Sequence, residues 1–166
     1  SGTDVDYTIE LIIEDIFGCK DTVNQNIIIY TRPVANFSIV DTGCGEVIYT
    51  PSNTSQYATT YNWTVTSSNF PATVVSPTDF APVITFPENT NTTEIIYTTE
   101  LIATTVNTCT DTTTQIVTIY PTPEVTFSAS NSSGCDSLDV LFTNNSDPFN
   151  GENITSMTFE WLVNQS

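Results

Sequence analysis

Apolar and polar residues alternate along several short stretches of the chain, with turn-forming residues between them. In the first stretch, the odd positions from 7 to 13 hold Tyr, Ile, Leu and Ile, and most positions between them are polar. A period of two is typical of a β-strand that buries one face. Thr, Val, Ile and Tyr are common, whereas Pro, Asn, Gly and Ser interrupt the chain about every ten residues. We therefore predict an all-β protein, with strands near 34–39, 46–50, 58–66, 82–87, 94–105 and 112–120.

The pattern also repeats along the chain. Four residues return 90 positions later: Tyr7, Cys19, Tyr30 and Pro33 correspond to Tyr97, Cys109, Tyr120 and Pro123. The correspondence continues from Phe37, Gly43-Cys44 and Tyr61-x-Trp63 to Phe127, Gly134-Cys135 and Phe159-x-Trp161, with the offset growing to 91 and then 98. Loops of unequal length between strands of fixed length produce such a drift. We predict three units: the C-terminal part of a first β-sandwich repeat at 1–32, a complete repeat at 33–122, and the N-terminal part of a third repeat at 123–166.

Only three residues join each predicted unit to the next. These linkers are Thr31-Arg32-Pro33 and Pro121-Thr122-Pro123. Proline fixes its own φ angle and cannot donate a backbone hydrogen bond, so it ends a strand while it keeps the chain extended. Linkers this short and stiff predict units that stack end to end in a semi-rigid rod.

Each predicted repeat contributes one cysteine before its second strand (Cys44, Cys135) and one in the turn before its last strand (Cys19, Cys109). The chain has no Cys-x-x-Cys pair and no histidine, so the pattern does not favour a zinc site. The distribution predicts a Cys44–Cys109 disulfide worth about 4 kcal/mol, with Cys19 and Cys135 bonded to cysteines outside this sequence. The alternative is a Cys19–Cys44 bridge across the linker. Either pairing requires an oxidising compartment.

Trp63 lies two residues after Tyr61, so both side chains point to the same face of one predicted strand. A tryptophan at this place fills the centre of a sandwich or, alternatively, forms a platform on which a sugar stacks. Because Trp161 recurs at the matching position, we predict that Trp63, Trp161 and Tyr97 are core residues.

The charge balance restricts the partners. Nineteen acidic residues stand against only Lys20 and Arg32, for a net charge of −17. Because Lys and Arg bind phosphates, neither nucleic acid nor an anionic membrane surface is an expected partner. No apolar stretch approaches the roughly 20 residues of a membrane helix. The first unit is predicted to begin inside a repeat, so we expect any targeting signal to lie upstream.

The residues that the common catalytic systems need are missing. Without histidine, neither a Ser-His-Asp nor a Cys-His arrangement can form. No glycine-rich phosphate-binding motif occurs, and acids such as Glu10 and Glu14 lie on the polar face of a strand. We predict that the protein is not an enzyme and needs no cofactor. Calcium is the one ion considered, because Asp147, Asn150 and Glu152 share an oxygen-rich loop, which a solvated turn also explains.

The repeat resembles the PKD-like, immunoglobulin-type modules that occur in tandem in giant surface adhesins of Bacteroidetes-type bacteria. The resemblance rests on Pro33-x-x-x-Phe37, Gly43-Cys44, Tyr61-x-Trp63, Tyr97, Cys109-x-Asp111-Thr112 and Tyr120-x-x-Pro123. It departs from the family after Trp63, where Thr-Val-Thr-Ser-Ser replaces the Gly-Asp-Gly turn of PKD domains. The resemblance implies tandem immunoglobulin-like (PKD-like) β-sandwich domains in a linear array, with the two cysteines of a module bridged. It also implies export by type IX secretion, sometimes as gliding-motility adhesins.

In secreted proteins of this kind, an Asp-Ser/Thr-apolar triplet accepts O-linked glycans. Thr22, Thr112 and Ser137 each follow an aspartate and are possible O-glycosylation sites by this resemblance. The alternative is that the aspartate caps the turn before a strand.

We expect a structural stalk of a long secreted or cell-surface adhesin filament that extends a distal binding tip. The alternative is an ancillary carbohydrate- or protein-binding module of a secreted enzyme, which would present several aromatic side chains in one exposed patch. The candidates for that patch are Tyr57, Phe70, Phe80 and Phe86. Expected partners are neighbouring repeats of the same chain, other copies and surface glycans.

Overall fold

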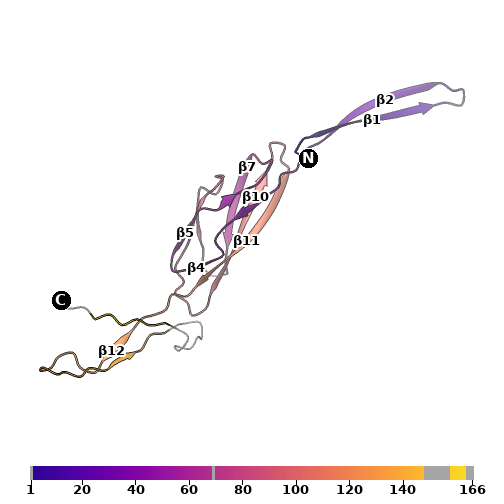
Figure 1. Cartoon of the computed structure of the whole chain (residues 1–166). Coiled ribbons are helices and arrows are strands. Elements are labelled where there is room, and N and C mark those ends of the chain that lie inside the picture. The colour runs from indigo at the N-terminus through magenta and orange to yellow at the C-terminus, as the bar shows by residue number, and fades with distance from the viewer. Residues whose placement is uncertain (1, 69, 148–157, 164–166) are drawn as a thin grey trace.

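The computed structural model describes residues 2–68, 70–147 and 158–163 and is all-β, with no helix in these ranges. Its strands are β1 (Val5–Glu14), β2 (Lys20–Ile29), β3 (Phe37–Ser38), β4 (Thr42–Cys44), β5 (Val47–Tyr49), β6 (Ser52–Asn53), β7 (Thr60–Thr66), β8 (Thr73–Val75), β9 (Val83–Phe86), β10 (Ile95–Thr104), β11 (Thr110–Tyr120), β12 (Phe127–Ala129) and β13 (Phe142–Asn144). Figure 1 shows an extended molecule. The β1–β2 hairpin lies at one end, β3 to β11 in the middle, and β12–β13 at the other end.

The middle segment, residues 33–122, has two main sheets that face each other. One sheet has the order β4-β11-β10-β7, with β4 parallel to β11 and the other pairs antiparallel. The second sheet has the order β5-β9-β8, and β3 and β6 form a separate two-stranded pair. Two residues of β9, Ile84 and Phe86, pack with Tyr97, Val117 and Ile119 of the first sheet. Contacts between the two sheets make the arrangement consistent with a β-sandwich.

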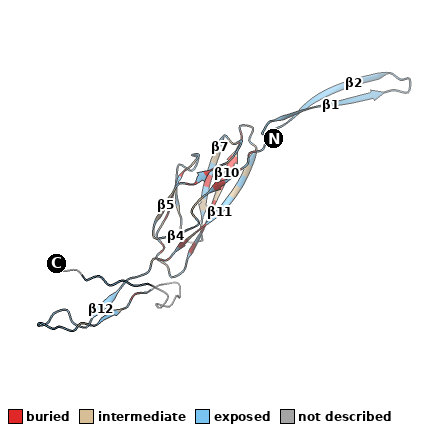
Figure 2. Ribbon diagram, viewed as in Figure 1, coloured by how far each residue is buried: buried red, intermediate tan, exposed pale blue. Residues whose placement is uncertain are grey.

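A second cluster of buried side chains fills the rest of the core of the middle segment. Trp63 is 1% exposed and packs with Phe37 and Leu101. The Phe37 and Trp63 rings meet edge to face at 4.9 Å. The indole Nε1 donates to the Asp79 carbonyl oxygen at 3.1 Å, so the buried ring has its polar atom satisfied. Buried residues are concentrated in the middle segment, as Figure 2 shows.

The two long hairpins share one geometry. Val5 pairs with Ile29 in β1–β2, and Ile95 pairs with Ile119 in β10–β11, which is the same register shifted by 90 residues. The turns at their tips also match, because the backbone N–H of Cys19 donates to the Asp15 side chain and that of Cys109 to the Thr105 side chain.

The short strand pairs repeat as well. β3 pairs with β6 through Phe37 and Asn53, and β12 pairs with β13 through Phe127 and Asn144. In both pairs, the asparagine side chain accepts from the N–H of a serine two residues later, at 3.0 Å and 2.9 Å. The recurrence found in the sequence is therefore also a recurrence of strand register and turn hydrogen bonding.

Corresponding residues differ sharply in burial. Tyr97 and Leu101 are fully buried in the middle segment, whereas Tyr7 and Leu11 are 53% and 61% exposed. Trp161, predicted for a core, is 52% exposed, although its ring contacts Phe127. The end segments therefore leave apolar side chains exposed. The equivalent side chains of the middle segment are covered by its second sheet.

The predicted Cys44–Cys109 disulfide is wrong for this structure, in which all four cysteines are free thiols. Cys44 pairs with Tyr120 at the end of β11, whereas Cys109 directly precedes the start of that strand. Eleven residues of strand separate the two ends by roughly 35 Å. A disulfide requires Cα atoms about 4.4–6.8 Å apart. The alternative Cys19–Cys44 bridge is not formed either, since Cys19 lies at the far tip of the β1–β2 hairpin.

The Tyr97 hydroxyl offers a test of the packing. Burial raises the pKa of Tyr97, and its hydroxyl is buried without a hydrogen-bond partner. Removing an unsatisfied buried hydroxyl relieves a desolvation cost, so Tyr97→Phe should leave the free energy of unfolding unchanged or raise it by about 1 kcal/mol. Tyr97→Ala should lower it by about 3–5 kcal/mol. Urea denaturation measures both, and a loss above about 1 kcal/mol in Tyr97→Phe would contradict this account of the core.

Candidate functional site

The first linker is bonded to the middle segment by an aspartate of β11. Arg32 Nη2 donates to Asp111 Oδ1 at 2.7 Å, and the backbone N–H of Ala35 donates to Asp111 Oδ2 at 2.9 Å. Pro33 between them is buried. One carboxylate therefore holds both the side chain of the linker and the backbone that follows it.

The electrostatics of this contact follow from its geometry. The hydrogen bond from the Ala35 N–H is the largest influence and holds the pKa of Asp111 below its ordinary value of 3.8; burial opposes it, and the charge of Arg32 acts in the lowering direction. The Asp111 side chain is 23% exposed and that of Arg32 is 73% exposed. Because Arg32 is solvated, the ion pair itself adds at most about 1 kcal/mol, and the backbone hydrogen bond fixes the position.

Two further contacts join the β1–β2 hairpin to the same region. The backbone N–H of Thr31 donates to Asp4 Oδ1 at 2.8 Å. Gly2 lies directly against the Tyr57 ring, since a Cβ atom added there would collide with that ring. Tyr57 has a φ of 61°, an unusual value for a residue with a side chain. The hairpin thus contacts the middle segment through Tyr57 as well as through the linker.

The second linker is anchored differently. The N–H of Thr122 donates to the carbonyl oxygen of Asn89 at 3.3 Å. Asn89 is fully buried, and its side-chain amide donates to the carbonyl oxygens of Thr93 and Ile119, each at 2.8 Å. Pro121 is also buried. A buried asparagine that satisfies several backbone groups ties this linker to the end of β11.

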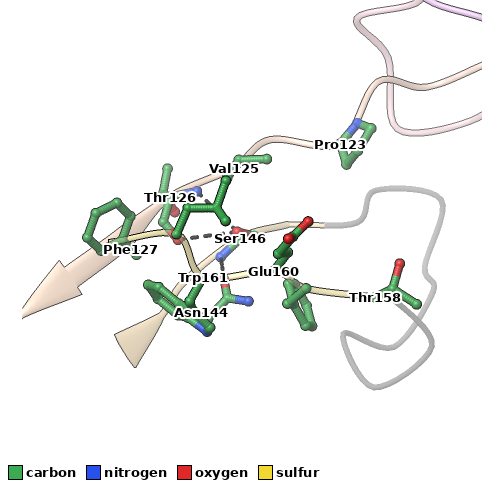
Figure 3. A pocket seen from close by; sticks show the side chains of 11 residues that line it. Pro123, Val125, Thr126, Phe127, Asn144, Ser146, Thr158, Glu160 and Trp161 are labelled. Atoms are coloured by element: carbon green, nitrogen blue, oxygen red, sulfur yellow. Dashed lines mark hydrogen bonds between the residues drawn. The ribbon is translucent and has the colours of Figure 1, made fainter. Parts of the chain in front are cut away.

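A hollow lies at the carboxy-terminal end of the described residues. It has a volume of about 460 Å³ and lies between residues 123–127, 144–146 and 158–162. Figure 3 shows Trp161 beside Asn144, with Phe127 nearby. The Phe127 and Trp161 rings meet edge to face at 5.5 Å, an arrangement like that of Phe37 and Trp63. The hollow therefore adjoins the Phe127–Trp161 pair, which is exposed. The equivalent Phe37–Trp63 pair of the middle segment is buried.

The four aromatic candidates for a binding patch do not gather. Phe86 is fully buried, which corrects its place among the exposed aromatics, and Phe70 packs against the main core. Tyr57 and Phe80 are 51% and 53% exposed, but Tyr57 lies at the first linker while Phe80 packs edge to face on Tyr61 at 5.2 Å. These residues do not form a shared stacking platform.

The possible glycosylation residues Thr22, Thr112 and Ser137 are all exposed. The aspartate before Thr22 and the one before Ser137 each accept from the N–H of that next residue. Asp111, before Thr112, is committed to the first linker. Glycosylation remains a prediction at all three.

The proposed calcium loop lies only partly within the described residues. Asn150 and Glu152 of the proposed calcium loop lie outside them, and Asp147 lies inside. The described part of the chain brings no three metal-binding side chains together. It also contains no helix of the length and hydropathy that a membrane span requires.

Comparisons with protein-family models, with curated proteins and with solved structures found no match. The contacts of the two linkers are therefore the observations from which a function can be inferred. In the sequence, Asp111 was used only in the motif Cys109-x-Asp111-Thr112 and as the aspartate before Thr112. Its signal was present, because Asp21 recurs 90 residues later as Asp111 and Arg32 is one of only two cations.

Asp111→Asn tests the first linker, and Asp21→Asn is its matched control, because Asp21 occupies the corresponding position in β2 and bonds only the next residue. We expect the Ala35 amide hydrogen to exchange about fivefold faster in Asp111→Asn, which corresponds to about 1 kcal/mol. The control should leave that rate unchanged. Hydrogen exchange followed by NMR measures this, and equal rates in both variants would contradict the role of Asp111.

Hydrogen-exchange protection of the Ala35 amide should also depend on pH. Because the folded-state pKa of Asp111 is depressed, its contribution is fully present above the ordinary value of 3.8 and disappears as pH falls through the lower folded value. Protection of Ala35, corrected for intrinsic exchange, should be constant from neutral pH down to pH 4 and decline below it, by about the amount lost in Asp111→Asn.

Proposed function

We propose that this chain is the structural stalk region of a long secreted or cell-surface adhesin filament. In this proposal, residues 1–32, 33–122 and 123–166 belong to successive immunoglobulin-like (PKD-like) repeats in a linear array. The carrying observation is that each linker is three residues long and bonded to the middle segment, the first through Asp111 and the second through Asn89. Units tied in this way extend the chain in one direction.

Several properties support an extracellular, load-bearing role. One middle segment spans about 35–40 Å along β11, so many copies would make a filament. The high negative charge keeps such a surface soluble and separates neighbouring filaments. Export by type IX secretion and a part in gliding motility remain proposals that rest on the family resemblance. The stalk role itself needs no catalytic group and no cofactor.

The alternative role as a carbohydrate- or protein-binding ancillary module has less support. It requires a platform of exposed aromatic side chains, and Phe86 and Phe70 are withdrawn into or against the core. Surface glycans and other copies of the chain stay proposed partners of the filament rather than ligands of a known cleft.

Inserting a second copy of residues 33–122 after position 122 tests the stalk. Small-angle X-ray scattering should show a maximum dimension longer by about 35–40 Å and an unchanged cross-section. A matched control changes Arg32→Gly and Pro33→Ser in the unmodified chain, which should broaden the distribution of dimensions because the linker loses its bond and its stiff residue. A compact, bent particle after the insertion would contradict the proposal.

A further inference from the structure

The middle segment carries one thiol at each of its two ends. Cys44 is the last residue of β4 and pairs with Tyr120, the last residue of β11, so it lies beside the second linker. Cys109 directly precedes β11, in the turn at the tip of the β10–β11 hairpin. Cys44 is exposed and Cys109 is partly exposed. Both thiols are therefore accessible to a neighbouring unit, whereas roughly 35 Å of strand separates them from each other.

A well-bonded turn holds Cys109 close to the first linker. The N–H of Cys109 donates to Thr105 Oγ1 at 3.2 Å, and its carbonyl oxygen accepts from the Thr105 N–H at 2.9 Å. Two residues further along the chain, Asp111 accepts from Arg32 and from the Ala35 N–H. Two residues of strand span about 7 Å. The Cα atom of Cys109 thus lies within about 7 Å of that of the residue that bonds the linker.

The same hairpin tip is connected to the preceding unit by a second route. The carbonyl oxygen of Thr104 accepts from the Thr59 N–H at 2.8 Å. Tyr57, two residues before Thr59, lies against Gly2, which directly precedes the base of the β1–β2 hairpin. The tip of β10–β11 and the base of β1–β2 therefore meet at the first linker.

The repeat predicts what lies on the other side of this linker. The β1–β2 hairpin has the register of β10–β11 shifted by 90 residues, and Tyr30 corresponds to Tyr120. In a unit like the middle segment, the cysteine at the position of Cys44 stands opposite this tyrosine, about 4.8 Å away across the strand pair. Tyr30 is only two residues before Arg32. That cysteine and Cys109 would thus lie on the two sides of one linker.

We propose that consecutive repeats are joined by a disulfide across each linker, between the cysteine at the Cys44 position of one repeat and the cysteine at the Cys109 position of the next. The inference rests on the proposed function, because it needs consecutive repeats. Cys19 occupies the Cys109 position of its own unit, and Cys135 occupies the Cys44 position. All four cysteines of the chain therefore have a place in the same pairing rule.

The chemistry of the cross-link is ordinary thiol–disulfide exchange. One sulfur–sulfur bond forms, and the two thiols together lose two protons and two electrons. A small disulfide such as oxidised glutathione takes them up and becomes two thiols. Because the linker already holds the two units together, each thiol meets the other at an effective concentration on the order of millimolar. The disulfide adds a second covalent connection between units beside a linker of three residues.

A chain with one added repeat tests the pairing. A second copy of residues 31–120, inserted after position 120, gives a new junction with the sequence of the first linker. The test variant keeps only Cys44 of the first copy and Cys109 of the second, with the other cysteines changed to serine. The matched control keeps Cys44 and Cys109 of the first copy. Both variants have the same length and two thiols, and they differ only in whether the thiols face one linker.

Both variants are equilibrated at micromolar concentration in a buffer of reduced and oxidised glutathione. The test variant should form a disulfide within one molecule, which lowers its mass by two hydrogen atoms and protects both cysteines from iodoacetamide. The control should contain at least roughly tenfold less of this species at the same glutathione ratio, because its thiols lie too far apart to bond. Mass spectrometry after alkylation measures both.

Small-angle X-ray scattering of the test variant separates this inference from the stalk. A particle longer by about 35–40 Å whose thiols stay reduced, or bond only between molecules, would overturn the disulfide and leave the stalk standing. Equal disulfide formation in the two variants would overturn the pairing rule, since thiols of one repeat would then bond as readily. A compact particle would contradict the stalk and, with it, this inference.

Discussion

Coverage of one apolar sheet face is the constraint on which this structure depends. The β10–β11 pair presents Tyr97, Leu101, Val117 and Ile119, and all four are fully buried because β9 and the Trp63 cluster lie over them. Burying one such side chain contributes about 1.5–3 kcal/mol, so this face supplies much of the stability of a small unit. An isolated two-stranded hairpin is marginally stable in water. The β1–β2 hairpin has the same register as β10–β11, but its apolar residues are exposed within the described part of the chain.

Ion pairs cannot replace burial of the apolar face as the main source of stability. The chain has nineteen acidic residues and two basic ones, and both bases form ion pairs: Lys20 with Glu14 at 3.2 Å and Arg32 with Asp111 at 2.7 Å. The first pair links the two strands near the tip of the exposed hairpin, and the second holds a linker. A chain so rich in one charge repels itself. Cohesion must come from apolar packing and from neutral hydrogen bonds, such as those of the fully buried Asn89.

The regular part of the fold could be read from the sequence because alternation reports directly on burial. The expected strand at 94–105 is β10 at Ile95–Thr104, and that at 82–87 is β9 at Val83–Phe86. β4, β6 and β8 were missed, whereas β3 and β5, which are equally short, fall within the predicted strands 34–39 and 46–50. Phe86 was a candidate for the exposed aromatic patch, yet it points inward from β9 and meets the Tyr97 ring at 5.1 Å. The linker contacts were not predictable, because periodicity does not reveal which side chain of a distant strand lies beside a linker.

The wrong disulfide has a more general cause. Even spacing of cysteines in a repeat says that they recur, but not at which end of a unit they lie. The parallel pairing of β4 with β11 brings Cys44 beside Tyr120 and the second linker, while the antiparallel β10–β11 hairpin puts Cys109 at the first linker end. Two thiols at opposite ends of one sandwich cannot bridge it. Any disulfide formed by either thiol must therefore join the middle segment to a group beyond it, so these cysteines bear on how units connect rather than on how one unit folds.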